Sequence, residues 1–400
     1  MKKSYQYKCT LLSDVILTSM ANTEGYKESL NYISGSKFLG IVAKKMHNLY
    51  DVNNAQQTLD LFHNGTVHFG DATPMIEEST TLKVPFSWFH EKGKKITEGI
   101  SLHHKVETSA SQLKQARDGY FSIDKESFTT VEQDFSVKSA YDGVKRKSLD
   151  ANMYGYFSLK QGTTWAFTVE DTSGKYADTI KSVLIGKHTI GKSKSAEYGL
   201  VNIEFVIEKT ETKTDVYKNE VLIYAQSNLC FYDNFGKTTA QPTVEQLVGT
   251  TNAEIIWKHS QVRSRNYQTW NGKRNNRDTD RLIIESGSVF FVKLDEAVPA
   301  SFFEKGIGKH RSEGFGAVIV NPSFLTSETE TLPITLNNVD LVLKQGYAFN
   351  GDSEDDLILN CLEKRQIRND FDYCIDKKVN DFVEKTNLNL KVFQIVNGVL

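Results

Sequence analysis

The segment Gly306-Ile-Gly-Lys-His-Arg-Ser-Glu-Gly-Phe-Gly316 decides the fold through the patterns on either side of it. A short helical pattern, Ser301-Phe-Phe-Glu304, precedes it, opened by Val298-Pro299 with proline where a first helical turn tolerates it. A strand pattern, Ala317-Val-Ile-Val320, follows it and is stopped by Pro322. The order is therefore a helix, a basic glycine-rich loop and a strand.

The same order occurs more than a hundred residues earlier. Lys175 to Ile185 predicts a helix, and the strand pattern Val201-Asn-Ile-Glu-Phe-Val-Ile-Glu208 comes later. Between them lies the loop Gly186-Lys-His-Thr-Ile-Gly-Lys-Ser-Lys-Ser-Ala-Glu-Tyr-Gly199. Two occurrences of one pattern at this distance predict two copies of one structural unit.

The rest of the chain is assigned around these copies. We expect a first domain over 1–210, a second over 211–330 and a helical tail over 331–400, with a helix near 352–385. Residues 90–150 are polar with little periodicity, so we expect an insertion there that is partly ordered only on binding. Near the N-terminus, Tyr5 to Thr18 predicts a strand and Ser34 or Ser36 caps a helix.

Both loops have the chemistry of phosphate sites. Glycine lets the backbone approach a ligand, successive N–H groups form an anion site, and lysine or arginine adds charge. The opening helix start, with Ser36 and Lys37, can bind anions in the same way. These features suit phosphate from a nucleotide or a nucleic-acid backbone such as RNA, and the predicted binding residues of the two loops are Gly186, Lys187, Gly191, Lys192, Lys194 and Gly199, then Gly306, Gly308, Lys309, His310, Arg311, Gly314, Phe315 and Gly316.

A nucleotide-binding interpretation competes at the first loop. Gly186-Lys-His-Thr-Ile-Gly191-Lys192-Ser193 matches the Walker A consensus. A P-loop needs a strand before it and a helix after it, whereas here a helical pattern precedes the string and a strand pattern follows. The context therefore disfavours an NTPase.

A third basic stretch mixes cations with aromatic residues. It runs from Val262 to Arg277 and includes Tyr267. Cations reach phosphates while aromatic faces stack bases, which favours single-stranded nucleic acid over a plain solvated surface. The predicted contacts here are Arg263, Arg265, Trp270, Lys273 and Arg274.

Composition places the chain among globular proteins of a reducing compartment. The 400 residues are 39% hydrophobic and carry a net charge of −2, so positive charge for nucleic acid must be local. The 4 cysteines are scattered, without zinc spacing, so we expect no metal and no cofactor. Ser13 and Asp14 interrupt the N-terminal apolar run, no stretch reaches the roughly 18 apolar residues of a spanning helix, and we expect a cytoplasmic protein.

Several segments, in this order, resemble the RAMP superfamily of CRISPR proteins. Tyr32-Ile-Ser-Gly-Ser-Lys-Phe-Leu-Gly40 is similar to that family's helix start, with Ser34 in place of its usual proline. The other segments are Gly65 to Pro74, Tyr154 to Phe167, Ser286 to Phe291 and Gly308 to Gly316. The resemblance covers about residues 1–325 and is greatest to the large RAMP subunit of type III-D effector complexes.

The resemblance implies an α+β fold of two ferredoxin-like (RRM-like) domains with antiparallel sheets. It also implies a non-catalytic subunit that holds the 5′ handle of the guide RNA. The implied partners are RAMP backbone subunits and the large polymerase-like subunit, with target RNA contacted indirectly.

An enzyme remains the alternative. Some RAMP relatives cut precursor guide RNA without metal, using histidine as general acid or base. His103 and His104 are the candidates for such an endoribonuclease, although phosphate contacts explain surface histidines as well. Asp71 is interpreted as structural.

Overall fold

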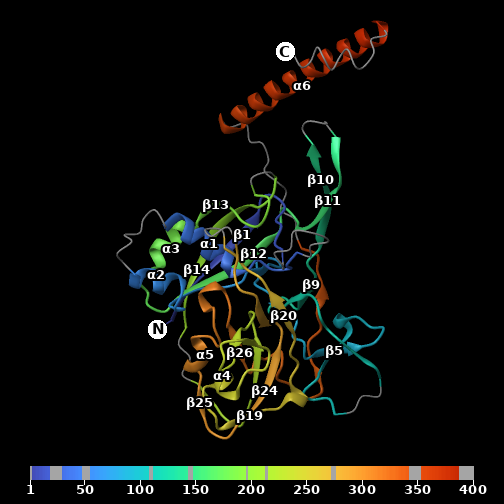
Figure 1. Ribbon diagram of the computed structural model, residues 1–400. Coiled ribbons are helices and arrows are strands. Elements are labelled where there is room, and N and C mark those ends of the chain that lie inside the picture. The colour runs from blue at the N-terminus through green and yellow to red at the C-terminus, as the bar shows by residue number, and fades with distance from the viewer. Residues whose placement is uncertain are drawn as a thin grey trace. The chain divides into compact units, whose positions relative to one another are not determined.

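The computed structural model describes residues 2–18, 29–46, 55–107, 111–142, 147–194, 197–211, 215–271, 276–341 and 353–386. Contacts between residues divide the chain into a large unit over 1–346 and a C-terminal unit over 347–400. The described residues of the C-terminal unit form the helix α6 (Ser353–Thr386), close to the predicted helical span. In the described part of the chain, no helix is both long and apolar enough to cross a membrane. The fold is α+β with mostly antiparallel sheets (Figure 1).

A first module is built on the strand that begins the chain. Its antiparallel sheet has the order β14-β1-β12-β2, with β13 outside β14 and β3 also on β12. Along the chain the connectivity is β1-α1-β2-β12-α3-β14, and α2 lies before β2. The bounds are β1 Lys2–Leu11, α1 Gly35–Met46, α2 Ala55–Phe62, β2 Val67–Phe69, β3 Thr73–Pro74, β12 Thr164–Asp171, α3 Ala177–Leu184, β13 Gly186–Thr189 and β14 Leu200–Glu211.

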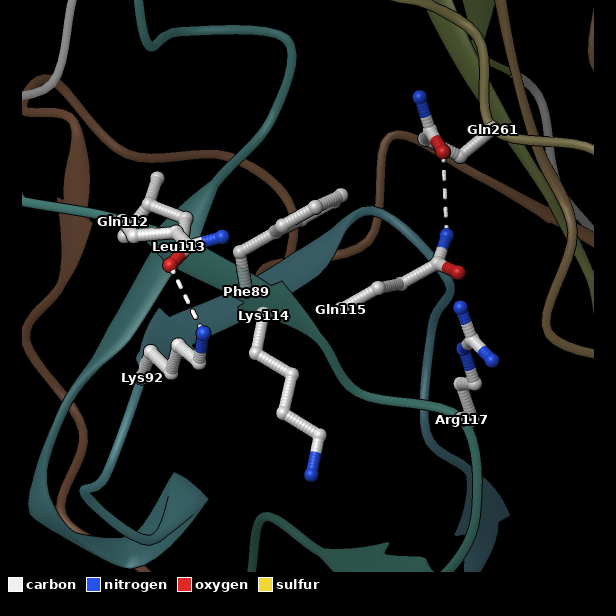
Figure 2. Close-up of a pocket in the computed structure, with 8 residues that line it drawn as sticks. All are labelled: Phe89, Lys92, Gln112, Leu113, Lys114, Gln115, Arg117 and Gln261. Carbon is white, nitrogen blue, oxygen red and sulfur yellow. Dashed lines mark hydrogen bonds between the residues drawn. The ribbon is translucent and has the colours of Figure 1, made fainter.

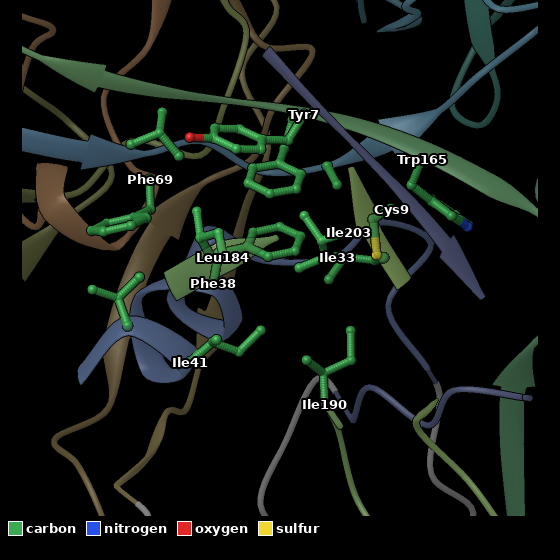
Figure 3. Packing of buried hydrophobic residues seen from close by; sticks show 14 of the residues in the cluster. Tyr7, Cys9, Ile33, Phe38, Ile41, Phe69, Trp165, Leu184, Ile190 and Ile203 are labelled. Carbon is green, nitrogen blue, oxygen red and sulfur yellow. The ribbon is translucent and has the colours of Figure 1, made fainter. Parts of the chain in front are cut away.

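Alternation along β1 produces the core of this module. Tyr5, Tyr7 and Cys9 are buried against the helices, while Gln6 and Lys8 point to the other face. The Phe38 ring of α1 stacks on Phe167 of β12 with centroids 3.6 Å apart. Figure 3 shows this packing between helix and sheet. The other face of the sheet remains partly exposed.

A second module repeats the first. Its antiparallel sheet has the order β26-β16-β24-β19, and its connectivity is β16-α4-β19-β24-α5-β26. In both modules the last strand therefore lies beside the first, then come the third and the second. The bounds are β16 Glu220–Ala225, α4 Val244–Val248, β19 Ala253–Ile255, β24 Val289–Leu294, α5 Ser301–Glu304 and β26 Val318–Val320.

Short paired strands surround the second module. β15 pairs with β25, β17 with β18, β20 with β23 and β21 with β22, all antiparallel. Val298–Pro299 forms β25 rather than the predicted first helical turn, because it pairs with β15. The other bounds are β15 Val216–Tyr217, β17 Phe231–Tyr232, β18 Thr238–Thr239, η2 Trp257–His259, β20 Ser264–Tyr267, β21 Trp270–Asn271, β22 Asn276–Arg277, β23 Arg281–Ile284 and η3 Arg311–Glu313.

The described residues of the insertion between β2 and β12 form paired strands, although residues 90–150 show little periodicity. It forms the sheets β27-β6-β5-β7 and β28-β9-β8-β4 and the long hairpin β10-β11. Its bounds are β4 Leu82–Lys83, β5 Trp88–Glu91, η1 Ile96–Glu98, β6 Ile100–Leu102, β7 Leu113–Gln115, β8 Tyr120–Ser122, β9 Ser127–Thr129, β10 Gln133–Asp142 and β11 Lys147–Leu159. The strands β27 (Thr331–Leu332) and β28 (Asn337–Asn338) show that the predicted helical tail begins with strands instead.

The insertion covers the second sheet on the face opposite α4 and α5. Leu222 and Tyr224 of β16 share a core with Trp88 and Phe121 of the insertion. The Tyr224 hydroxyl donates to the Lys83 carbonyl at 2.6 Å. Both faces of the second sheet are therefore buried, whereas the first sheet keeps an open polar face.

Candidate nucleic-acid interface

The first glycine-rich segment differs from the predicted loop at its start. Gly186–Thr189 forms β13, which pairs antiparallel with β14, and the described residues 190–194 and 197–199 between these strands form bends and turns. Gly199 has φ 88°, and a Cβ there would lie 2.2 Å from the Ile190 carbonyl oxygen. Glycine is therefore required here by the tight turn itself.

The Walker-like string does not have P-loop surroundings. Its first four residues are an edge strand of an antiparallel sheet, preceded by α3 and followed after the turn by β14. A P-loop runs from a strand into a helix. The position between the second helix and the last strand of the module is the one that the sequence pattern predicted.

Cations gather around this turn. Lys187 and Lys194 are exposed, and the half-buried Lys192 amine lies 5.1 Å from the Tyr156 ring centroid. Burial, and then the charge of Lys194, lower the pKa of Lys37 in α1, so these two amines share one region. Lys37 of the predicted helix start is thus near Lys194, whereas the Ser36 hydroxyl lies 3.0 Å from the Ser34 hydroxyl.

The second glycine-rich segment, predicted to bind phosphate, is buried at its end. Gly314, Phe315 and Gly316 are buried against the first module. Gly314 has φ 106°, and a Cβ there would lie 2.7 Å from Asp71 Oδ1 and 2.9 Å from the Phe69 carbonyl oxygen. The close approach that these glycines permit is to protein, because the segment joins the two modules.

Most polar side chains of the second segment have protein partners. Arg311 donates to the Lys305 carbonyl at 2.8 Å, and His310 shares hydrogen bonds with Tyr232 and Glu313. Burial alone would raise the pKa of Glu313, but the hydrogen bonds and charges of His310 and Arg281 lower it to about 2. Lys309 is the exposed cation of this segment.

Asp71 lies where the two modules meet. Its Oδ1 accepts the Gly35 N–H at 2.8 Å, at the first residue of α1. Burial raises the pKa of Asp71 to about 7, although the Gly35 hydrogen bond and the Arg265 charge oppose that rise. The sequence showed this residue as a carboxylate after a strand, without indicating that Gly314 would pack on it.

The third basic stretch is divided between the interior and the surface. Arg265 donates to the Tyr32 hydroxyl at 2.9 Å, joining residues far apart in sequence, and Arg263 donates to Gln115 at 2.7 Å. Trp270 on β21 is 52% exposed. The predicted contacts Lys273 and Arg274 lie outside the described residues.

The candidate histidines His103 and His104, and His188 of β13, each make a hydrogen bond or a ring contact with a neighbouring residue. His104 is buried, its Nε2 lies 3.0 Å from the Leu325 carbonyl, and burial lowers its pKa to about 4. His103 stacks on Phe89 with ring centroids 5.3 Å apart, and His188 hydrogen-bonds the Leu184 carbonyl. Across the described ranges, no group of three or more His, Cys, Asp or Glu residues is arranged to hold a metal ion.

Comparisons with known proteins give weak likenesses of fold. No family model and no curated protein matches the chain. A chain of the type III-B Cmr-beta complex bound to cognate target RNA has TM-score 0.43 and 11% identity, over 75% of this chain and 88% of that one. A chain of the same complex with cognate target RNA and AMPPnP has TM-score 0.42 and 10% identity, over 75% and 87%. Function must therefore be argued from this chain's own residues.

Proposed function

We propose that this chain is a non-catalytic guide-RNA-binding subunit of a type III CRISPR effector complex. In this role it holds the 5′ handle of the guide in a cytoplasmic complex of the III-D subtype. It contacts RAMP backbone subunits and the large polymerase-like subunit, and it meets target RNA only through the guide.

The observation that carries the proposal is the repeated module. Both modules have the connectivity β-α-β-β-α-β and the same strand order, which supports the ferredoxin-like arrangement that the resemblance implies. In each, a basic glycine-rich segment lies between the second helix and the last strand. This supports the sequence resemblance to RAMP proteins, whose glycine-rich loops occupy that position.

The first glycine-rich turn is the better candidate for RNA. Lys192 and Lys194 lie in this turn, Lys187 lies in the adjoining β13, and Lys194 is near Lys37, whereas the end of the second segment joins the modules. The open face of the first sheet carries Gln6, Lys8 and Thr10. Those side chains offer no aromatic surface for base stacking, so backbone contacts at the turn are the favoured mode.

RNA binding by the purified full-length chain tests the proposal. We expect labelled repeat RNA to bind without being cut, and Lys192→Ala/Lys194→Ala to weaken that binding. Each lost phosphate contact lowers the log–log salt slope for single-stranded RNA by about 0.7, so the double variant should lose about 1.4. Fluorescence anisotropy over a salt series measures both quantities.

The matched control is Lys218→Ala/Lys258→Ala, which removes two exposed lysines of the second module. It should keep the wild-type affinity and slope. Unchanged affinity and slope in a folded Lys192→Ala/Lys194→Ala protein would contradict the proposal at this turn. Cleavage of the repeat RNA would instead identify an endoribonuclease.

A further inference from the structure

The helix α6 of the C-terminal unit, red in Figure 1, carries an apolar ridge. The ridge consists of large apolar residues at every fourth position, Ile367, Phe371, Ile375 and Val379. Residues four positions apart lie on the same side of a helix, so these side chains form one continuous row. They are 68%, 63%, 44% and 38% exposed, and every side chain over 363–382 is exposed. Nothing in the described part of the chain therefore covers the ridge.

The charges within the ridge are all positive. Because successive residues of a helix are about 100° apart, the ridge occupies an arc of about 120°. The charged residues inside this arc are Lys364, Arg368 and Lys378. The acidic residues of the same stretch all lie outside it, namely Glu363, Asp370, Asp372, Asp376 and Asp381. A surface that complements the ridge must therefore offer apolar groups together with negative charge.

A second copy of α6 does not have that complementary surface. A coiled coil needs apolar residues alternately three and four positions apart. The two heptad seams through Phe371 both include Lys364 and Lys378, and each has a third charged residue as well. If two copies paired about Phe371, lysine would face lysine in the parallel and in the antiparallel arrangement. Like charges held opposite each other disfavour this pair.

An anionic membrane or a nucleic acid also fits the helix poorly. The stretch 363–382 contains five acidic and five basic residues, so it has no net positive charge. A helix that lies on a membrane has a polar face rich in lysine and arginine, whereas the polar face of α6 carries the acidic residues. Binding to phosphates likewise requires an excess of positive charge. The pattern favours a protein partner.

The cavity beside β7 in the large unit lacks such a combination on one face. It has a volume of about 400 Å³ and is lined by Phe89 and Lys114. Phe89 pairs with Gln115 and His90 pairs with Lys114 across β5 and β7. The Phe89 ring and the Lys114 amine therefore point to opposite faces of this sheet (Figure 2). On α6, by contrast, apolar side chains and cations share one face.

We propose that the ridge of α6 docks onto a neighbouring protein subunit of the effector complex, at an apolar surface with acidic residues at its rim. A ridge of residues four positions apart fits the groove of a helix that crosses it at about −50°. Such a crossing gives a compact contact centred on Phe371 and Ile375. The inference rests on the proposed function, which supplies the neighbouring subunits, but it requires no RNA at α6.

The test measures binding of the purified full-length chain to the RAMP backbone subunit and to the large polymerase-like subunit of its complex, each immobilised separately. We expect one of them to bind with a Kd that Phe371→Ala raises at least about tenfold, because the contact loses an aromatic anchor. Tyr373→Ala is the matched control, since Tyr373 is 69% exposed on the opposite side of the same helix. This control should bind as the wild type does.

A second pair of variants tests the charges of the ridge. Lys364→Glu/Lys378→Glu reverses two cations inside the arc, and Arg365→Glu/Lys377→Glu reverses two cations outside it. Both variants change the net charge equally, so they differ only in the face of the helix that is altered. We expect the first to weaken binding at least about tenfold and the second to leave it unchanged. Circular dichroism of each variant verifies that the helix content is retained.

The outcomes separate this proposal from the function it rests on. If the wild type binds repeat RNA and a subunit, and neither ridge variant weakens subunit binding, the ridge is not a docking surface and the proposed function stands. If the wild type binds RNA but neither subunit, this inference fails and RNA binding stands. If it binds neither RNA nor a subunit, both fail.

Two further measurements test the other occupants of the ridge. Sedimentation that shows wild-type dimers, dissociated by Phe371→Ala, would assign the ridge to a second copy of the chain. Flotation with phosphatidylglycerol vesicles that Phe371→Ala abolishes would assign it to a membrane. Either result would overturn the proposal, and we expect a monomer that does not float with the vesicles.

Discussion

At the scale of single residues, the Asp71 carboxyl should make the free energy of unfolding decrease as the pH rises, which is the opposite of the effect of a salt-bridged carboxylate. Burial raises the pKa of Asp71 in the folded chain to about 7 from 3.8. Between pH 3.8 and pH 7, therefore, Asp71 is protonated in the folded chain and ionised in the unfolded chain. Stability must therefore fall as the pH rises through this window. In Asp71→Asn, whose side-chain oxygen can still accept the Gly35 N–H, we expect this pH-dependent loss of stability, on the order of 4 kcal/mol, to be absent.

Urea unfolding of the wild type and of Asp71→Asn between pH 4 and pH 8 measures this difference. The exposed Asp124→Asn is the matched control for loss of one carboxylate. Stability curves of the wild type and Asp71→Asn that run parallel over the whole range would show that Asp71 titrates normally.

At the scale of elements, the second glycine-rich segment joins the modules and should behave as core. Gly314→Ala places a Cβ against Asp71 and Phe69 at a φ of 106°, whereas Gly93→Ala has a similar φ of 96° and no atom within 4 Å. We expect Gly93→Ala to cost about 1 kcal/mol for backbone strain and Gly314→Ala about 2–4 kcal/mol, because overpacking adds to it. Denaturant unfolding measures the free energy of unfolding of both variants. Equal decreases in the two variants would show that the second segment can shift to accommodate the added Cβ.

At the scale of the whole molecule, the large unit should unfold as one body, because the insertion, the second module and residues 331–338 share a core. Leu336 is 2% exposed in that core, and Ile367 of the C-terminal unit is 68% exposed. We expect Leu336→Ala to cost about 2–5 kcal/mol and Ile367→Ala almost nothing. Thermal melts followed by calorimetry and by tryptophan fluorescence should shift together, and separate transitions for the insertion would contradict a shared core.

Local patterns predicted the modules well because each strand and helix shows its own periodicity. The position of the glycine-rich segments between the second helix and the last strand followed from residue order alone. The strands of the insertion were not predicted, because they are short and their apolar residues, such as Trp88 and Phe121, pack against residues far along the chain. For the same reason, no local signal showed that Gly314 contacts Asp71 or that Arg263 reaches Gln115.

The shared core also has a consequence for the order of folding. The Trp88 indole N–H donates to the Phe324 carbonyl across 236 residues of chain, and β27 closes the sheet of the insertion from still further on. Contacts so distant in sequence slow folding, since a long loop must close before they form. Residues 82–129 are synthesised before the residues that cover them, so we expect their apolar side chains to stay exposed in the nascent chain until the end of the large unit has emerged from the ribosome.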